Sequence, residues 1–374
     1  MSGTTRFARR AMVRLGLSLP LLSAACAGPA RSTDLHDTLE HLCEKNRVPG
    51  LAAAVWRGPV RVAAAAAGVR KHNDPTPVTI DDQWHLGSDT KAMTATLVGL
   101  FVDRGNLRFE DVLGEALSDW RLHPGYAGVS IEQLLQHRGG TPPDVPDDLK
   151  GLLTDGDPST ARAAVVRAIL ARPPTGAAGR FSYSNIGYLA LGVILEQKGG
   201  TSWESLMRTE LFTPLRMNSA GFGPPGNPAT VDQPWGHTDD LEPMPPADPR
   251  SDNPPAYGPA GTVHCALADW AKFLSQHLAG ARGDPTILTP TTMSRLHQPP
   301  PDGDYAAGWI LTTRDWANGP VLTHVGSNNL WTAETWLAPK KNLTFAAVTN
   351  RGGDTAHETT ATVIDWLVET YADA

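Results

Sequence analysis

The sequence contains little cysteine, with only three in 374 residues. So few cysteines cannot build the dense disulfide framework that holds small secreted domains together. The chain must therefore fold around an apolar core, and its 41% hydrophobic residues suffice for one large domain or two smaller ones. Cys43 and Cys265 could bond to each other, but we expect two unpaired, buried thiols.

Beyond its first residues the chain also lacks any cluster of lysine and arginine, and its formal net charge is −7. A nucleic-acid-binding surface needs concentrated positive charge, so nucleic acid is not expected as a partner. The pair His357-Glu358 is not followed by a second histidine at the spacing of zinc metalloproteases. A zinc site of that kind is therefore excluded.

The first residues have the pattern of a targeting segment. Four arginines, at positions 6, 9, 10 and 14, precede a short apolar stretch, Leu15–Leu22, and a run of small residues. This order is that of an export signal, and the apolar stretch is too short to span a membrane. The arginine pair at 9 and 10 also resembles a twin-arginine signal. We expect residues 1–27 to direct export, so that the protein is periplasmic, secreted or lipid-anchored at the cell envelope.

The end of this segment, Ser23-Ala24-Ala25-Cys26, resembles a lipoprotein cleavage site with Cys26 as the lipidated residue. Lipidation there would attach the mature protein to a membrane. Ordinary cleavage within the same run of small residues is the alternative, and the pattern favours neither. The sequence contains no pattern that indicates the oligomeric state.

Strand patterns lie near both ends of the chain, and helix patterns fill the middle. Short apolar runs between turn residues predict strands over 51–57, 60–69, 307–312, 321–324, 330–337 and 343–349. Helical periodicity predicts helices over 33–46, 92–103, 131–136, 161–171, 186–197, 202–211, 267–278 and 355–371. One antiparallel sheet built from both chain ends and flanked by helices is the economical arrangement. We expect an α/β (α+β) domain over residues 33–374, with a mostly helical subdomain at about 89–300 inserted in the sheet subdomain.

A proline-rich segment interrupts the helical part. Eleven prolines lie between Gly223 and Gly261, with little apolar patterning. A segment of this length is either disordered or part of a functional surface. If it is ordered, Trp235, His237 and Tyr257 are candidates for the wall of a substrate cleft.

The stretch HLGSDTKAMTATL, residues 85–97, places Ser88 three residues before Lys91, where a loop leads into a helix. Three residues are nearly one helical turn, so the two side chains would share a face. Lys91 could then accept the proton of the Ser88 hydroxyl, because burial and the helix N-terminus both favour the neutral amine. The apolar residues that follow predict a buried helix. No G-x-S-x-G pattern surrounds Ser88, which argues against the nucleophile turn of α/β-hydrolases.

Two further motifs follow, Tyr-Ser-Asn at 183–185 and His-Val-Gly at 324–326. Together with the Ser-x-x-Lys at 88–91, they resemble the ordered motifs of the serine hydrolases related to class C β-lactamases, penicillin-binding DD-peptidases and esterases. Surrounding segments such as LLQHRGG and YAAGWIL are also similar, so the resemblance covers about residues 35–370. It implies a β-lactamase/transpeptidase-like fold and a serine hydrolase that needs no metal and no cofactor.

The resemblance also implies the catalytic roles. Ser88 would attack a carbonyl carbon with assistance from Lys91 and Tyr183, and water would hydrolyse the acyl-enzyme. The cation of Lys91 would stabilise a Tyr183 phenolate, which could relay the serine proton and protonate the leaving group. Whether Lys91 or Tyr183 is the general base stays open.

The remaining motif residues would bind the substrate. Asn185 offers an amide to the substrate, or it caps the helix that follows. His324 would donate to a substrate carboxylate or carbonyl, and Gly326 would let the substrate approach the backbone. The N–H groups of Ser88 and Ser327 would form the oxyanion hole.

The substrate is a small molecule or a peptide, and three functions remain. Many related β-lactamases have lysine where His324 stands, and histidine is a weaker anchor for a β-lactam carboxylate at neutral pH. We therefore expect a hydrolase of esters, amides or β-lactams with esterase character. A D-peptide hydrolase or DD-carboxypeptidase is the first alternative. A non-catalytic binding module that keeps the penicillin-recognition fold is the second.

Overall fold

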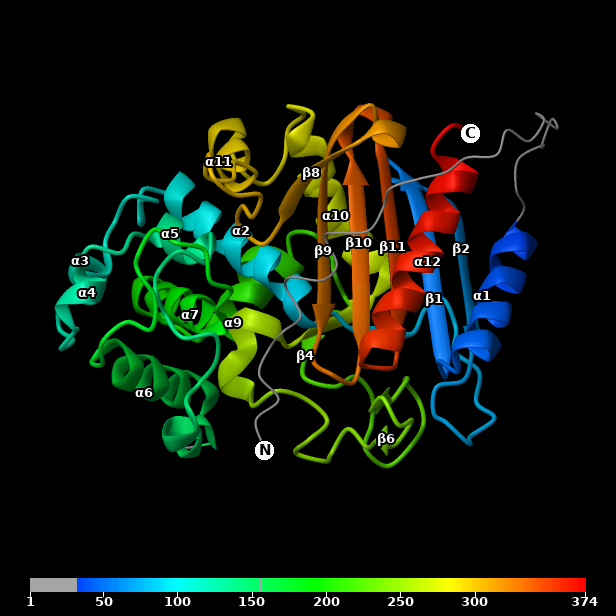
Figure 1. The fold of residues 1–374 in the computed structure, drawn as a ribbon, viewed down its shortest axis with the longest axis horizontal. Helices are drawn as coiled ribbons and strands as arrows, with labels where there is room; N and C mark the ends of the chain where they lie inside the picture. Colours follow the sequence, from blue (N-terminus) through cyan, green and yellow to red (C-terminus); the bar gives the residue numbers. More distant parts are fainter. Residues whose placement is uncertain (1–31, 155) are drawn as a thin grey trace. The chain divides into compact units, whose positions relative to one another are not determined.

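The centre of the fold is a six-stranded antiparallel sheet with the strand order β2-β1-β11-β10-β9-β8 (Figure 1). The computed structural model describes residues 32–154 and 156–374. The strands of the sheet are β1 (Gly50–Arg57), β2 (Val60–Gly68), β8 (Ile310–Arg314), β9 (Gly319–Ser327), β10 (Thr332–Ala338) and β11 (Leu343–Thr349).

The two ends of the chain meet in the middle of this sheet. Strand β1 pairs with β2 on one side and with β11 on the other, where Leu51 faces Thr349. Every residue of β11 is buried, and so is every residue of β1 except Arg57. Strands buried on both faces read as continuous apolar runs, because neither face meets water. The predicted fold class is confirmed.

Helices cover both faces of the sheet. Helices α1 (Ser32–Asn46) and α12 (Asp354–Tyr371) pack on one face, and α10 (Leu267–Ala281) packs on the other. In Figure 1, α12 lies in front of the strands and α10 behind them. On the α12 face, Thr360 donates a hydrogen bond to the buried Glu334 of β10 at 2.9 Å.

Most remaining helices lie between β3 and β8 in the sequence. They are α2 (Thr90–Asp103), α3 (Leu113–Ala116), α4 (Pro124–Ala127), α5 (Ile131–Leu135), α6 (Pro158–Leu170), α7 (Asn185–Gly199), α8 (Trp203–Leu206), α9 (Gly258–Gly261) and α11 (Pro290–Leu296). Two small sheets accompany them, built from β3 (Gln83–His85), β7 (Val263–Ala266) and β4 (Gly221–Phe222), and from β5 (Gly236–His237) and β6 (Pro243–Met244).

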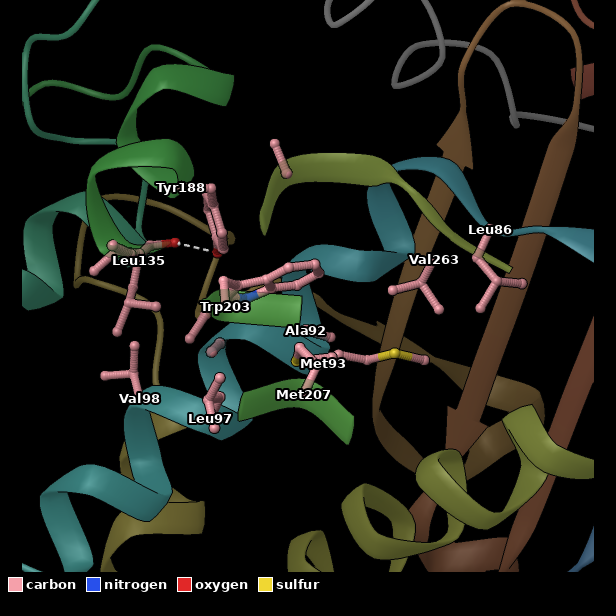
Figure 2. Packing of buried hydrophobic residues seen from close by; sticks show 14 of the residues in the cluster. Leu86, Ala92, Met93, Leu97, Val98, Leu135, Tyr188, Trp203, Met207 and Val263 are labelled. Atoms are coloured by element: carbon pink, nitrogen blue, oxygen red, sulfur yellow. Dashed lines mark hydrogen bonds between the residues drawn. The ribbon is translucent and has the colours of Figure 1, made fainter. Parts of the chain in front are cut away.

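Helix α2 is buried over twelve consecutive residues, from Thr90 to Phe101. It belongs to a large apolar cluster, part of which Figure 2 shows, with Met93 and Leu97 near Trp203 and Met207. A helix surrounded by protein in this way has little freedom to shift. Any side chain at its N-terminus is therefore held in a fixed position.

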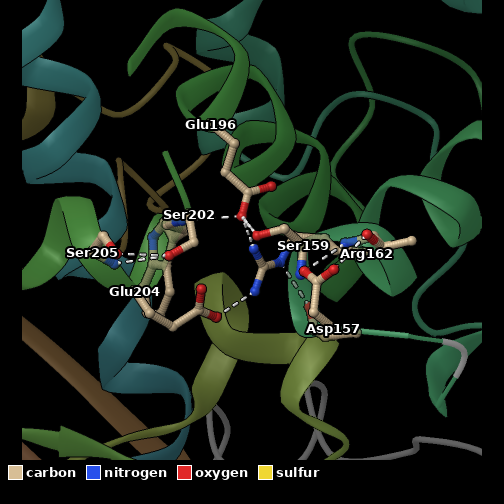
Figure 3. Close-up of polar contacts among 10 residues, drawn as sticks. Asp157, Ser159, Arg162, Glu196, Ser202, Glu204 and Ser205 are labelled. Carbon is tan, nitrogen blue, oxygen red and sulfur yellow. Dashed lines mark hydrogen bonds and ion pairs between the residues drawn. The ribbon is translucent and has the colours of Figure 1, made fainter. Parts of the chain in front are cut away.

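A buried arginine joins three helices of this region (Figure 3). Arg162 of α6 is fully buried and forms ion pairs with Glu196 of α7 and Glu204 of α8. It also donates to the carbonyl oxygen of Ala256 at 2.9 Å, in the proline-rich segment. Because a buried charge must be paired, these contacts fix the helices and the segment relative to one another.

Three predicted elements differ clearly from the structure. The strand predicted over 321–324 is longer and runs over Gly319–Ser327. The helix predicted over 202–211 is a short α8 followed by a π-helical turn, Met207–Phe212. The strand predicted from residue 307 begins at Ile310, because Gly308 has a φ of +81°. A Cβ on Gly308 would lie 2.5 Å from Ala92 Cα, so this backbone packs directly against α2.

The cysteine prediction is confirmed, since Cys43 and Cys265 are both free and buried. Burial raises the pKa of the Cys43 thiol to about 12, which keeps it protonated and unreactive. These thiols therefore act as small apolar side chains of the core.

The predicted export signal, residues 1–27, lies outside the described residues, and so does Cys26. Within 32–154 and 156–374, no helix combines the length and the apolar content that a membrane-spanning helix requires. Export and lipid attachment therefore stay predictions.

Candidate active site

Ser88 and Lys91 lie together at the N-terminus of α2. Ser88 is part of a 3-10 turn, Gly87–Asp89, which joins β3 to the helix. The Nζ atom of Lys91 donates to Ser88 Oγ at 2.9 Å and to the carbonyl oxygen of Ala260 at 2.7 Å. The predicted shared face is therefore present, and the amine lies within proton-transfer distance of the hydroxyl.

The environment of Lys91 favours its neutral form. The side chain is fully buried, and burial lowers the pKa of its amine to about 7, against the opposing effect of Asp144 and Asp89. A neutral amine can still donate to Ala260 while its lone pair accepts the proton of Ser88. The neutral amine is thus accessible near neutral pH.

Tyr183 lies over the lysine, with its ring centroid 4.9 Å from Lys91 Nζ. It forms a group of aromatic rings with His137 at 4.1 Å and Tyr305 at 6.1 Å between centroids. Burial raises the pKa of the Tyr183 phenol above its ordinary value, although a hydrogen bond with Ser88 opposes this. The expected stabilisation of a phenolate is therefore not the dominant effect.

His137 stacks against Tyr183, and its part in the site was not predicted from the sequence. Its φ of +56° fits a turn. Its ring is 2% exposed, and Nδ1 accepts a hydrogen bond from the backbone N–H of Ser184 at 3.1 Å. That bond places the ring proton on Nε2, which has no partner. A lone His-Arg-Gly-Gly stretch carries no signal for stacking on a distant tyrosine.

Asn185 opens α7, but it does not cap the helix. Ser184 is the N-cap, since its Oγ accepts from the backbone N–H of Gly187 at 3.2 Å. The Asn185 side chain instead donates to Asp144 Oδ1 at 2.7 Å. The capping interpretation is therefore wrong, and the amide is directed to an exposed carboxylate.

His324 lies deeper than expected, with 3% of its surface exposed. Its Nε2 is 3.3 Å from the hydroxyl of Tyr305, and its Nδ1 is 3.5 Å from Oδ1 of Asp89. Asp89 is equally buried, and burial raises the pKa of its carboxyl above the ordinary value. Both imidazole nitrogens thus face protein groups, and the expected contact with a substrate stays a prediction.

Glycines bring β9 against the turn that holds Ser88. A Cβ on Gly326 would lie 2.0 Å from the carbonyl oxygen of Leu86, and one on Gly87 would lie 2.4 Å from Ser327 N. Only glycine permits so close an approach of two backbones. The backbones of Ser88 and Ser327, the two predicted oxyanion donors, therefore lie beside each other.

The proline-rich segment is ordered and holds the site from one side. Asp252 bonds to His85 at 2.9 Å and to Asn328 at 2.9 Å, which links the entry strand of the nucleophile to the end of β9. The same segment supplies Ala260, whose carbonyl binds Lys91. A backbone acceptor of this kind has no sequence signal.

Of the three residues predicted to line a substrate cleft, only Tyr257 forms a hydrogen bond with a segment of the site. Its hydroxyl accepts from the backbone N–H of Val145 at 3.3 Å, next to Asp144. Trp235 packs under Lys71, 4.4 Å from the amine to the ring centroid. His237 is buried and bonds to the carbonyl of Asn350. The latter two stabilise the end of the sheet.

No group of three or more His, Cys, Asp or Glu side chains is arranged to hold a metal ion among the residues that the structure describes. The predicted chemistry at Ser88 would not require one, because Lys91 or Tyr183 would supply the base. That the enzyme needs no cofactor stays a prediction.

Comparison with known proteins places this geometry in a family. A model of the Beta-lactamase family matches residues 35–369. Penicillin-binding protein 4 of Amycolatopsis lactamdurans is 29% identical over 339 residues, which cover 84% of each chain. A beta-lactamase of Escherichia coli K12 is 26% identical over 330 residues, covering 85% of this chain and 81% of that one.

Solved structures share the fold. A beta-lactamase from Sulfitobacter sp. EE-36 superposes with a TM-score of 0.73 at 21% identity, over 91% of this chain and 99% of that chain. The octameric penicillin-binding protein homologue from Pyrococcus abyssi gives 0.72 at 21% identity, over 91% and 78%. The family model covers nearly all of the described residues, and the chain belongs to the beta-lactamase family of serine hydrolases.

Proposed function

We propose that the protein hydrolyses carboxylic esters and related amides through an acyl-enzyme at Ser88. The observation that carries this proposal is the 2.9 Å contact between Ser88 Oγ and the fully buried amine of Lys91. A serine hydroxyl becomes a nucleophile only when a base takes its proton. A lysine with a pKa near 7 is such a base at neutral pH.

The steps follow from the positions of the groups. Lys91 accepts the Ser88 proton as Oγ attacks the carbonyl carbon, and the N–H groups of Ser88 and Ser327 bind the oxyanion. The protonated amine returns a proton to the leaving group, directly or through the phenol of Tyr183. Water then attacks the acyl-enzyme with the same base and releases the acid.

The choice of esters over β-lactams rests on His324. A β-lactam carries a carboxylate, which needs a cationic group at the site. The imidazole of His324 is enclosed between Asp89 and Tyr305 and does not present a free cation. Esters without a carboxylate need no such anchor.

The test compares p-nitrophenyl butyrate, nitrocefin and a D-Ala-D-Ala peptide on protein lacking residues 1–27, with Ser88→Ala as control. We expect turnover of the ester, much weaker turnover of the other two, and no activity in Ser88→Ala. A fluorophosphonate should label Ser88 in the wild type. Absence of both turnover and label would point to the non-catalytic binding module.

A D-peptide hydrolase is the second candidate, and the edge of β9 favours it. Strand β8 pairs with residues 319–323 of β9 and leaves His324–Ser327 without a neighbour on that side among the described strands. An extended peptide could bind there as an additional strand. The likeness to penicillin-binding protein 4 of Amycolatopsis lactamdurans supports the same candidate. Faster turnover of the peptide than of the ester would establish it.

We also propose that residues 1–27 export the protein, to the periplasm, the medium or the cell envelope. The basic, apolar and small-residue regions of this segment support the proposal. A lipid on Cys26 would add membrane attachment. Fractionation of cells that express the full chain, with Cys26→Ala beside it, distinguishes soluble export from anchoring.

A further inference from the structure

Two carboxylates flank the Ser88–Lys91 pair. Asp89 follows the nucleophile in the chain, and Asp144 is exposed and accepts a hydrogen bond from Asn185. Both act electrostatically on Lys91 and on Tyr183. When ionised, they place negative charge beside the pair.

Asp89 faces the histidine that stands where a carboxylate anchor is expected. The two side chains are 4% and 3% exposed, and the atoms that face each other are 3.5 Å apart. The second carboxylate oxygen, Oδ2, has no hydrogen-bond partner. Whatever positive charge His324 carries is thus offset within the protein, because the low dielectric of the interior makes this pairing strong.

Asp144 adds a second negative charge on the open side. It is exposed, and the side chain that bonds to it among residues 32–154 and 156–374 is the neutral amide of Asn185, at 2.7 Å. In the described ranges, no arginine or lysine forms an ion pair with Asp144 or with Asp89. Lys150 acts on Asp144 electrostatically without forming an ion pair with it, and Asp89 faces His324.

We propose that Asp89 and Asp144 make the site select against acyl donors that carry a carboxylate near the scissile bond. This selection rests on the proposed ester hydrolysis at Ser88. Neutral and cationic acyl donors are then the preferred substrates. The oxyanion of the transition state adds negative charge at the same place, so a substrate carboxylate meets repulsion that grows as the reaction proceeds.

The experiment uses three p-nitrophenyl esters that differ mainly in charge. They are the neutral butyrate, the anionic glutarate monoester and the cationic 4-(trimethylammonio)butyrate. We expect kcat/KM of the wild type to be at least tenfold higher for the butyrate than for the glutarate. The cationic ester should equal or exceed the butyrate.

The variants are Asp89→Asn and Asp144→Asn, with Asp373→Asn as matched control. Asp373 is also a carboxylate, but it pairs with Lys341 at the C-terminal end of the chain. Each site variant should lower the ratio of kcat/KM for the butyrate to kcat/KM for the glutarate at least threefold. The control should leave this ratio unchanged. Because this ratio compares two substrates on one preparation, partial misfolding of a variant does not alter it.

The salt dependence distinguishes the contributions of the two carboxylates to this selection. Raising NaCl from 20 mM to 500 mM should weaken the selection due to the exposed Asp144 and leave that due to the buried Asp89. If the wild type hydrolyses all three esters with equal efficiency, or if both variants keep the wild-type ratio, the selection proposal is wrong while ester hydrolysis stands. If no ester reacts and Ser88 takes no label, the proposed function itself fails.

Discussion

Gly87 and Ser327 are in direct contact where the nucleophile turn meets β9. The φ of Gly87 is +51°, and a Cβ on it would lie 2.4 Å from the backbone nitrogen of Ser327. The positions of two predicted oxyanion donors thus depend on a residue without a side chain.

The variant Gly87→Ala tests this contact. We expect at least a hundredfold loss of kcat on p-nitrophenyl butyrate, because the methyl group must push Ser327 away from Ser88. Gly105→Ala is the matched control, since Gly105 has a φ of +73° with nothing within 4 Å. Both variants suffer the left-handed backbone penalty of about 1–2 kcal/mol. Equal activity losses in the two would show that the contact has no role.

The pKa of Lys91 predicts the pH dependence of the reaction. The amine is a base only above a pKa of about 7, so kcat/KM should rise through that pH and then level off. Lys91→Arg keeps the charge but cannot lose the proton, and we expect a loss of at least a hundredfold. A pH profile without a limb near 7, or an active Lys91→Arg, would assign the base to Tyr183.

The same lysine should reduce stability at low pH. Its pKa is about 7 in the folded state and 10.5 ordinarily, so the unfolded state binds the additional proton between these values. Stability of the wild type therefore rises with pH across this window. Lys91→Met should melt higher than the wild type at pH 6, and the difference should shrink toward pH 9. A difference that is constant with pH would contradict a buried charge as its cause.

Replacing Arg162, which lies far from the nucleophile, should have a large effect on the stability of the protein. Arg162→Leu leaves Glu196 and Glu204 without their common partner, which costs about 3–5 kcal/mol of unfolding free energy. Arg172→Leu removes an exposed pair with Asp148 and should cost less than about 1 kcal/mol. Urea unfolding of both variants measures the difference, and similar midpoints would show that the network is not structural.

Glu334 should make the stability of the protein depend on pH in the opposite direction to Lys91. Burial raises the pKa of its carboxyl to about 7, so the folded state holds a proton that the unfolded state has released between pH 4.5 and 7. Stability falls as pH rises across this window. Glu334→Gln keeps partners for Trp336 and Thr360, and it should be more stable than the wild type at pH 8, by up to about 3 kcal/mol.

The control for this variant is Glu358→Gln, an exposed position on α12. Its melting temperature should follow that of the wild type at both pH 5 and pH 8. If the gain in stability of Glu334→Gln over the wild type is the same at pH 8 as at pH 5, the carboxyl of Glu334 is already ionised in the folded state at pH 5.

The sequence by itself determined the six strands of the central sheet, the main helices and the Ser88–Lys91 contact. Those features depend on local periodicity, and a spacing of three residues on a helix fixes a shared face without help from the rest of the chain. The class of the fold followed from where strand patterns lay along the chain.

Only the tertiary structure decided what surrounds that pair. The carbonyl of Ala260, the ring of His137 and the enclosure of His324 by Asp89 and Tyr305 join segments far apart in the sequence. Backbone acceptors and stacked rings leave no pattern of residue types, because any residue can supply a carbonyl. The pKa of Lys91 likewise comes from burial by the whole domain, which no local stretch can specify.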